Sequence, residues 1–281
     1  MTKAKQPKIG IYPNMPFKDY LAIDAVSNSY LSQIKDCPAK ALVEVKETPA
    51  MIFGRAAHSF ILEGEKKFDT EYIVSPKFDR RPTAGKKAYE RFCELAKTKT
   101  IISAEDFLKI RNMNSAVYNH PMAKKLLAGG TVEQTIIWKE PVTGILCKSR
   151  LDVLPDEKKG AVVDLKTTND SSEYGFRRSI IKYGYHRQGA FYPDALYNVK
   201  VGKVGKNTVY DAFIIIAVEK KEPYAVNCFF LSPELIEYGR QEYLELLRVH
   251  KKCKEEKSYP HWNDPEDNGG LITVELPGYL G

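Results

Sequence analysis

Hydrophobic residues change their spacing near residue 130, and this change divides the chain into a helical part and a sheet-rich part. Before that point, apolar residues recur three or four positions apart in segments bounded by capping residues, proline or glycine, which is typical of amphipathic helices. Residues 1–20 indicate an irregular arm and residues 65–85 a loop-rich stretch. We expect helices over residues 28–37, 50–63, 84–97 and 103–127.

Beyond residue 130, β-branched and aromatic residues gather in short runs separated by turn residues, which favours strands. The fold class is therefore α/β, with a mixed central sheet flanked by helices and a helical elaboration before it. We expect strands at 132–138, 145–153 and 161–166 in an antiparallel meander, a helical stretch at 172–197, strands at 209–217 and 224–231, and a helix at 233–257. We expect one domain over 1–281, made of an arm (1–26), a helical part (27–130), a sheet and helix (131–231), and a long helix with a tail (232–281).

The composition is that of a soluble globular protein, with 43% apolar and 28% charged residues. The net charge of +7 is compatible with a polyanionic partner but does not require one. No apolar run approaches the roughly 20 residues that span a bilayer, and the first residues lack the apolar core of a signal peptide. Five scattered cysteines without CxxC pairs favour a reducing cytosol over a disulfide framework or a zinc site.

The strongest chemical signal lies in the predicted hairpin at 151–168, which carries Asp152, Asp164 and Lys166. Asp164 and Lys166 are two positions apart, so their side chains share one face of a strand, and Asp152 can reach that face from the partner strand. Two carboxylates and an ammonium at one place destabilise a fold unless they are used, and a divalent metal beside an attacking water would use all three. The alternative is that the acids pair with Lys148 and Lys166 on a solvated face.

Other segments strengthen the chemical interpretation, because they match a known family in order and at sensible spacing. The matching segments are Ser29-Tyr30-Leu31 with Cys37-Pro38, Phe53-Gly54-Arg55-Ala56-Ala57-His58, the hairpin Asp152…Asp164-Leu165-Lys166, and Gln188-x-x-x-Tyr192. Together they resemble the RecB-like branch of the PD-(D/E)xK nuclease superfamily, and within it the exodeoxyribonuclease VIII (RecE-type) nuclease domain. Leu151 stands where the motif has proline, which leaves the acid that carries the chemistry in place.

The resemblance implies a Mg²⁺-dependent exonuclease that degrades double-stranded DNA ends 5′ to 3′ and leaves a 3′ single strand. It further implies a phage or bacterial cytoplasmic protein, assembly into a homo-oligomeric ring (a tetramer in the family), and work beside a single-strand annealing recombinase. Some relatives carry an iron–sulfur cluster, but the late cysteines here lack the close spacing that such a cluster needs, so we expect none. The chain has no G-x-x-x-x-G-K-[ST] loop, so we expect no nucleotide cofactor.

The resemblance also gives the metal centre its expected residues. Asp152, Asp164 and the main-chain carbonyl of Leu165 would hold Mg²⁺, for which Mn²⁺ can substitute. His58 would ligate the metal or lie next to its ligands, and Glu133 would join a second metal or bind its water. Lys166 would orient and help deprotonate the attacking water, and we expect burial and the metal to depress its pKa.

The remaining expected site residues would contact DNA or support the metal centre. Gln188 and Tyr192 lie four positions apart on one helical face, where Gln188 would contact DNA or Lys166 and Tyr192 would support the site. Arg55, Arg177, Arg178 and Gln188 are candidate DNA contacts, and we expect Arg177 and Arg178 to open the helix that bears Gln188.

Three alternatives stay open at the level of the sequence. One is an endonuclease or end-trimming nuclease with the same fold, which cleavage of circular DNA would separate from an exonuclease. Another is a DNA-binding module whose nuclease core is inactive, although Asp152, Asp164 and Lys166 are all present. The last is an unrelated metal hydrolase that acts on small phosphoesters, which would need no duplex end.

Overall fold

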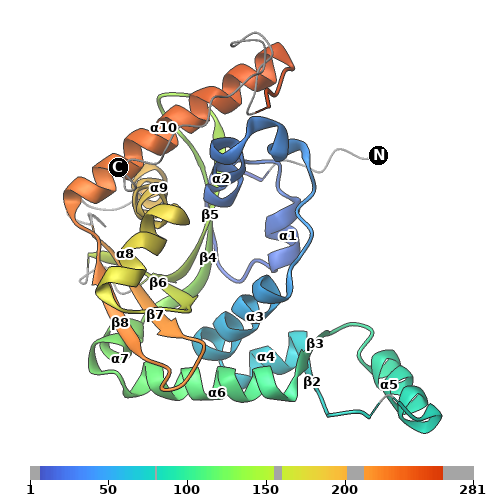
Figure 1. The fold of residues 1–281 in the computed structure, drawn as a ribbon. Coiled ribbons are helices and arrows are strands. Elements are labelled where there is room, and N and C mark those ends of the chain that lie inside the picture. The colour runs from blue at the N-terminus through green and yellow to red at the C-terminus, as the bar shows by residue number, and fades with distance from the viewer. Residues whose placement is uncertain (1–6, 80, 155–159, 201–211, 262–281) are drawn as a thin grey trace, which may run out of the picture.

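The computed structural model describes residues 7–79, 81–154, 160–200 and 212–261, and its centre is a six-stranded mixed sheet (Figure 1). The strand order is β1-β4-β5-β6-β7-β8, in which β6 and β7 are parallel and every other neighbouring pair is antiparallel. The strands are β1 (Gly10–Tyr12), β4 (Thr131–Lys139), β5 (Leu146–Leu154), β6 (Ala161–Thr168), β7 (Ala212–Glu219) and β8 (Val226–Phe230). The mixed sheet predicted from the sequence is confirmed.

Helices cover both faces of this sheet. The α-helices are α1 (Phe17–Ala22), α2 (Asn28–Asp36), α3 (Pro49–His58), α4 (Glu65–Glu71), α5 (Thr83–Leu95), α6 (Ala104–Asn119), α7 (Pro121–Leu127), α8 (Glu173–Lys182), α9 (Tyr185–Lys200) and α10 (Pro233–Glu256). A short 3₁₀ helix, η1 (Pro38–Leu42), follows α2, and one π-helical turn, η2 (Ser59–Glu63), continues α3. A parallel pair, β2 (Tyr72–Ser75) and β3 (Thr100–Ser103), forms a second small sheet beside α4 and α6.

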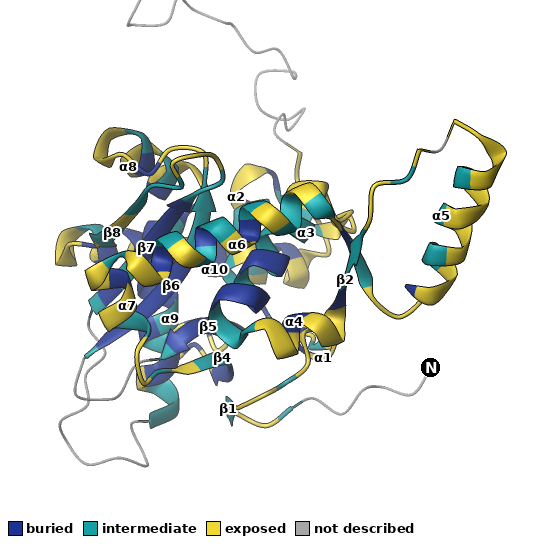
Figure 2. Cartoon of the chain, turned by 90° about the horizontal axis from the view of Figure 1, so that it is seen from below, coloured by how far each residue is buried: buried dark blue, intermediate teal, exposed yellow. Residues whose placement is uncertain are grey.

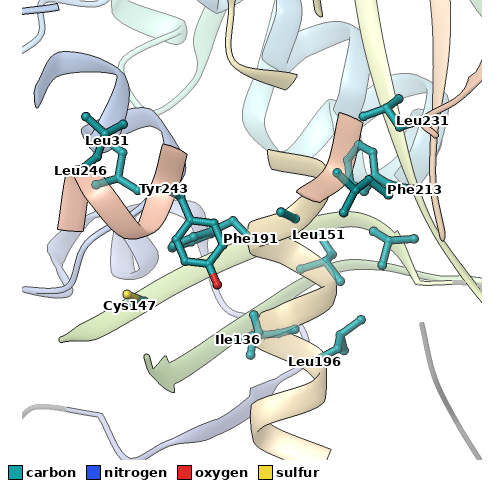
Figure 3. Packing of buried hydrophobic residues seen from close by; sticks show 14 of the residues in the cluster. Leu31, Ile136, Cys147, Leu151, Phe191, Leu196, Phe213, Leu231, Tyr243 and Leu246 are labelled. Carbon is teal, nitrogen blue, oxygen red and sulfur yellow. The ribbon is translucent and has the colours of Figure 1, made fainter. Parts of the chain in front are cut away.

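The two hydrophobic clusters follow from the alternation of side chains along the central strands. In β7, Ile215 packs in one cluster with α2, α9 and α10, whereas Ile216 packs in the other with α3 and α6. Phe191 of α9 meets Tyr243 of α10 edge-on in the first cluster, with ring centroids 5.4 Å apart (Figure 3). Since both faces of β6 and β7 are covered, polar side chains on these strands are buried unless a cavity reaches them.

The predicted helix starts are confirmed where a capping side chain marks them. The hydroxyl of Ser27 accepts the backbone N–H of Tyr30 at the start of α2, and Ser103 accepts that of Asp106 at the start of α6. Both side chains satisfy N–H groups that the first helical turn leaves without partners.

Other sequence predictions were wrong in detail. The N-terminal arm contains β1, which pairs with β4, and the short helix α1. Residues 65–75 form α4 and β2 rather than a loop. The helix expected at 103–127 breaks before Pro121, whose ring cannot continue the hydrogen-bond ladder, and the stretch at 172–197 breaks at Tyr183 and Gly184.

Helix α5 stands away from the central sheet and contains no buried residue (Figure 2). Among the residues that the structure describes, no helix combines the length and apolar character needed to cross a bilayer. Most of the predicted tail, from residue 262 onward, lies outside the described residues.

Candidate active site

The two acids of the hairpin are buried, so the alternative of a solvated ion-paired face is wrong. Asp152 is 8% exposed and Asp164 is 1% exposed. The ammonium of Lys148 does not serve them, because it donates to the carbonyls of Tyr20, Leu21 and Ile23 at distances of 2.8 to 3.2 Å. Burial of two carboxylates without solvent is costly, which calls for a partner of positive charge.

Asp164 receives its hydrogen bond and its ion pair from two different elements. The side-chain amide of Gln188, on α9, donates to Oδ1 of Asp164 over 2.6 Å. The ammonium of Lys166 lies 2.6 Å from the other oxygen, Oδ2. This Oδ2 is buried and has no hydrogen-bond donor in acceptable geometry among the described residues, which leaves lone-pair capacity for a cation.

Asp152 joins the two strands of the hairpin and also meets the end of α3. Its Oδ2 accepts the backbone N–H of Leu165 over 2.8 Å. The same oxygen lies 3.5 Å from Nδ1 of His58, the last residue of α3. The strand pairing of Val153 with Val163 sets this register and brings Asp152 opposite Asp164. The expected convergence of His58, Asp152, Asp164 and Lys166 is therefore what the structure has.

His58, Glu133 and Asp152 offer ligand atoms that all lie within 4.8 Å of one another. Two carboxylates and one imidazole form a donor set that suits Mg²⁺ or Mn²⁺. Together with the free capacity of Asp164, this set fits a divalent metal at the end of the hairpin. The main-chain carbonyl of Leu165 stays a predicted ligand.

Glu133 has a backbone conformation that is rare for its residue type, with a φ of 53°. This left-handed residue interrupts the alternation of β4, since Val132 packs in one hydrophobic cluster and Ile136, four residues on, packs in the other. Its carboxylate forms an ion pair with Arg150 and remains within the metal-ligand group. Strain of this kind collects at functional sites, so Glu133 has stronger structural support than its strand-edge position in the sequence suggested.

Both hairpin acids are harder to ionise than usual in the metal-free protein. Burial raises the pKa of Asp152 to about 6, with Lys166 opposing the rise and Glu133 adding to it. Burial also raises the pKa of Asp164 to about 7, and the neighbouring Asp152 adds to this rise. A bound divalent cation would favour the ionised forms of both acids.

The pKa of Lys166 is raised, opposite to the depression expected from its burial. Burial does disfavour the ammonium, but the nearby carboxylates of Asp164 and Asp152 outweigh it and hold the pKa above its ordinary value. Without a metal, Lys166 is therefore a protonated counter-ion of the two acids. His58 behaves differently, because burial and the charge of Lys166 lower its pKa and leave a neutral imidazole that can ligate a metal.

A cavity of about 290 Å³ opens beside the ligand group. Its wall is formed by α1, with Phe17 and Tyr20, and by Arg55, Arg150 and Tyr192. Tyr192 lines this cavity, and burial raises its pKa well above the ordinary value. Arg55 lies over the ring of Phe17 at 5.4 Å and pairs with Glu47, so it borders the cavity but is partly neutralised.

The arginines expected at the start of the Gln188 helix lie on a different helix. Arg177 and Arg178 are exposed on α8, whereas Gln188 is on α9, because the chain turns at Gly184, which has a φ of 68°. Gln188 donates to Asp164, rather than contacting Lys166 as expected from the sequence.

Four further residues of the site were not predicted from the sequence. The ring of Tyr185 lies 5.1 Å from the Lys166 ammonium, and Phe17, Tyr20 and Arg150 line the cavity. The aromatic residues of α1 fall in a stretch with no strong periodicity, so no pattern pointed to them.

Comparison with known proteins places this geometry in a family. The model of the family DUF3799, described as a PDDEXK-like domain of unknown function, matches residues 27–264. A crystal structure of a candidate exonuclease from Eubacterium rectale superposes with a TM-score of 0.57 at 13% identity, covering 94% of this chain and 97% of that one. A further solved structure, of a protein called SSO0001, covers 89% of this chain and 96% of its own at 13% identity, with a TM-score of only 0.30. No curated protein matches the chain.

Proposed function

Because the chain belongs to the family of PDDEXK-like domains, we propose that it is a divalent-metal-dependent nuclease that degrades linear double-stranded DNA from its ends. The observation that carries the proposal is the convergence of four side chains from three elements. Asp152 and Asp164 come from the hairpin, His58 from α3, and Lys166 lies 2.6 Å from Asp164. A purely structural set of this kind would bury two acids at a cost that the fold does not need.

Each residue has a distinct role in this proposal. His58, Glu133, Asp152 and Asp164 would hold the metal, which when bound would act as a Lewis acid on the scissile phosphate and make a water more acidic. Gln188 keeps Asp164 oriented through its amide. Lys166 is placed to contact a water or a phosphate oxygen once the cation has taken over the charge of the two acids.

The proposal of attack at DNA ends draws on the residues that line the cavity. Helix α1 forms a wall of Phe17, Tyr20 and Leu21 beside the ligand group. We infer that these side chains pack against the end of a strand in the site. The candidate exonuclease from Eubacterium rectale has a similar fold, which supports the same choice.

Polarity and assembly extend the proposal through the resemblance to RecE-type nucleases. We propose digestion 5′ to 3′ that leaves a 3′ single strand, Mg²⁺ as the physiological metal, a homo-oligomeric ring, and a single-strand annealing recombinase as partner. An endonuclease with the same catalytic residues is the second candidate, because the ligand group by itself does not select an end.

The test compares linear and covalently closed circular duplex of the same sequence, both stained after electrophoresis, in Mg²⁺, in Mn²⁺ and in chelator. We expect degradation of the linear form alone, only with metal, and loss of at least a hundredfold in rate for Asp164→Ala and Lys166→Ala. Cleavage of the circular duplex would show that the protein is an endonuclease rather than an exonuclease. Intact linear DNA with both metals, or undiminished cleavage by the variants, would refute the proposed nuclease.

A further inference from the structure

One face of α8 presents aromatic and cationic side chains to solvent, and the active site uses none of them. Tyr174 is 76% exposed and Ile181 is 46% exposed. Arg177, Arg178 and Lys182 are exposed on the same helix. The other four positions follow Tyr174 by three, four, seven and eight residues, which places all five on one helical face.

Aromatic rings and cations lie next to one another on this face and at the end of the helix, where Tyr183 follows Lys182. The guanidinium of Arg178 lies 6.0 Å from the ring centre of Tyr174, and the ammonium of Lys182 lies 5.4 Å from that of Tyr183. The one acid on the face, Glu173, pairs with Arg177 over 3.2 Å. The surface therefore keeps a positive charge around two tyrosines that are open to solvent.

A line of aromatic rings connects this face to the catalytic lysine. Tyr183, at the end of α8, is 54% exposed, and its ring centre lies 5.8 Å from that of Tyr185. The ring of Tyr185 in turn lies 5.1 Å from the ammonium of Lys166. The contacts from Lys166 to Tyr185 and from Tyr185 to Tyr183 thus lead from the half-buried lysine to the exposed end of α8.

A cavity continues the surface beyond Tyr183. Its volume is about 440 Å³, and its wall includes Ile181, Lys182, Tyr183 and Lys35. Lys35 is held at this wall by an ion pair of 2.7 Å with Glu242. The wall also contains Asp36, which pairs with Lys40. The ring of Tyr183, the aliphatic side chain of Ile181 and the ammonium of Lys182 are the groups that suit a base and its phosphate.

We propose that this surface, the α8 track (Tyr174, Arg177, Arg178, Lys182 and Tyr183), binds an unpaired stretch of the DNA strand adjoining the active site. The proposal rests on the proposed nuclease function and deepens it. Phosphates are attracted by the cations, and unpaired bases stack on the exposed rings, as in surfaces that bind single strands without sequence preference. An intact duplex buries its base faces in its own stack, so it would leave both tyrosines unused.

The test measures binding of fluorescent 20-nucleotide strands by anisotropy in chelator, with the full chain. One probe is oligo(dT), and the other is an abasic strand with the same phosphates and no bases. We expect the wild type to prefer oligo(dT), and Tyr174→Ala/Tyr183→Ala to weaken its binding at least tenfold while leaving the abasic strand unchanged. Arg178→Ala/Lys182→Ala should weaken both probes alike and reduce the slope of log K against log salt by about 0.7 per lost phosphate contact.

The matched control is Tyr197→Ala, which removes a tyrosine that is 60% exposed on α9 and lies outside the track. Equal affinity of the wild type and the double tyrosine variant for oligo(dT) would refute the proposed role of the α8 track. An equal loss of affinity in Tyr197→Ala and in the double tyrosine variant would refute it as well. Because these measurements use no metal and no cleavage, they stand apart from the nuclease assay. If the wild type does not cleave DNA but the tyrosine variant binds oligo(dT) more weakly than the wild type, the nuclease proposal fails and the α8 track stands. If the wild type cleaves DNA but the tyrosine variant binds oligo(dT) equally well, only the α8 track is refuted.

Discussion

Gln188 donates its side-chain amide to Oδ1 of Asp164 over 2.6 Å, across the gap between α9 and β6. The contact leaves the opposite oxygen of Asp164 to Lys166 and to a cation. The bond therefore fixes which edge of the carboxylate faces the metal position. A residue that acts in this way positions a ligand without touching the substrate.

Replacing Gln188 tests this positioning role. We expect Gln188→Ala to raise the Mg²⁺ concentration at half-maximal activity and to lower the rate by about 10- to 100-fold, the range found when partners of metal ligands are removed. Titration of nuclease activity with metal measures both effects. Gln134→Ala is the control, since Gln134 is also buried but donates to Val132 of its own strand. Equal metal requirements in the two variants would contradict the positioning role.

The raised pKa of Asp152 predicts that this acid destabilises the metal-free protein at high pH. In the unfolded chain its pKa is the ordinary 3.8, and in the folded protein burial raises the pKa to about 6. The folded state therefore binds the proton more tightly, and its stability falls as pH rises from 3.8 to 6. At pH 8 in chelator, the free energy of unfolding of Asp152→Asn should exceed that of the wild type by on the order of 1–3 kcal/mol. Its unfolding temperature should be correspondingly higher.

The difference between these two proteins should shrink as pH falls from 6 toward 3.8, because both then carry a neutral side chain in the folded state. Millimolar Mn²⁺ should reverse the order at pH 8, since a ligand that binds only the folded wild type stabilises it. Thermal melts at several pH values, with and without metal, check both points. If the wild type is more stable than Asp152→Asn in chelator at pH 8, then burial of the ionised Asp152 does not destabilise the metal-free protein.

We expect replacement of Lys148 to lower the stability of the protein rather than to impair its chemistry, although Lys148 lies on the strand that carries Asp152. Its buried ammonium donates to the carbonyls of Tyr20, Leu21 and Ile23 and so fastens the end of α1 to β5. Lys148→Met should lower the free energy of unfolding by roughly 2–4 kcal/mol, because charged hydrogen bonds are lost and carbonyls stay unsatisfied. Denaturant titration measures this. An unchanged midpoint would mean that α1 is held by its apolar contacts alone.

Local sequence signals were sufficient for the long elements of the fold and for most of the site. Capping residues such as Ser27 and Ser103 marked helix starts, and the alternating runs around Asp152 and Asp164 marked the hairpin. The short strands β2 and β3 were not predicted, because each pairs with a strand 25 or more residues away in a two-stranded sheet. Such non-local pairing leaves no periodicity in a stretch of four residues.

The undetected features of the site share one property, which is that they depend on tertiary contacts. The left-handed backbone of Glu133 has no signature in residue type, since glutamate seldom adopts it. Lys148 and Lys166 look alike in the sequence, yet one satisfies backbone carbonyls and the other satisfies an acid. Only the packing of α1 against β5 separates the two roles.

Gly54 and Gly239 both lie in helices, but the space around their Cα atoms differs. A Cβ at Gly54, in α3, would meet the nearest atom, Oγ1 of Thr167, at 4.0 Å, which is ordinary contact. A Cβ at Gly239, in α10, would lie 2.2 Å from the backbone oxygen of His186 in α9. The first site can accept alanine, whereas the second would force two packed helices apart.

We therefore expect Gly54→Ala to keep its nuclease activity and to gain about 0.5–1 kcal/mol of stability from the better helix former. Gly239→Ala should lose about 3 kcal/mol or more, because backbone cannot move aside as a flexible side chain can. Denaturant unfolding followed by circular dichroism compares both with the wild type. An inactive but folded Gly54→Ala would mean that the glycine of the segment before His58 serves the chemistry through a close approach of DNA. Retained activity would show that neither the chemistry nor close packing requires a glycine here, and that His58 carries the metal-binding role of the segment.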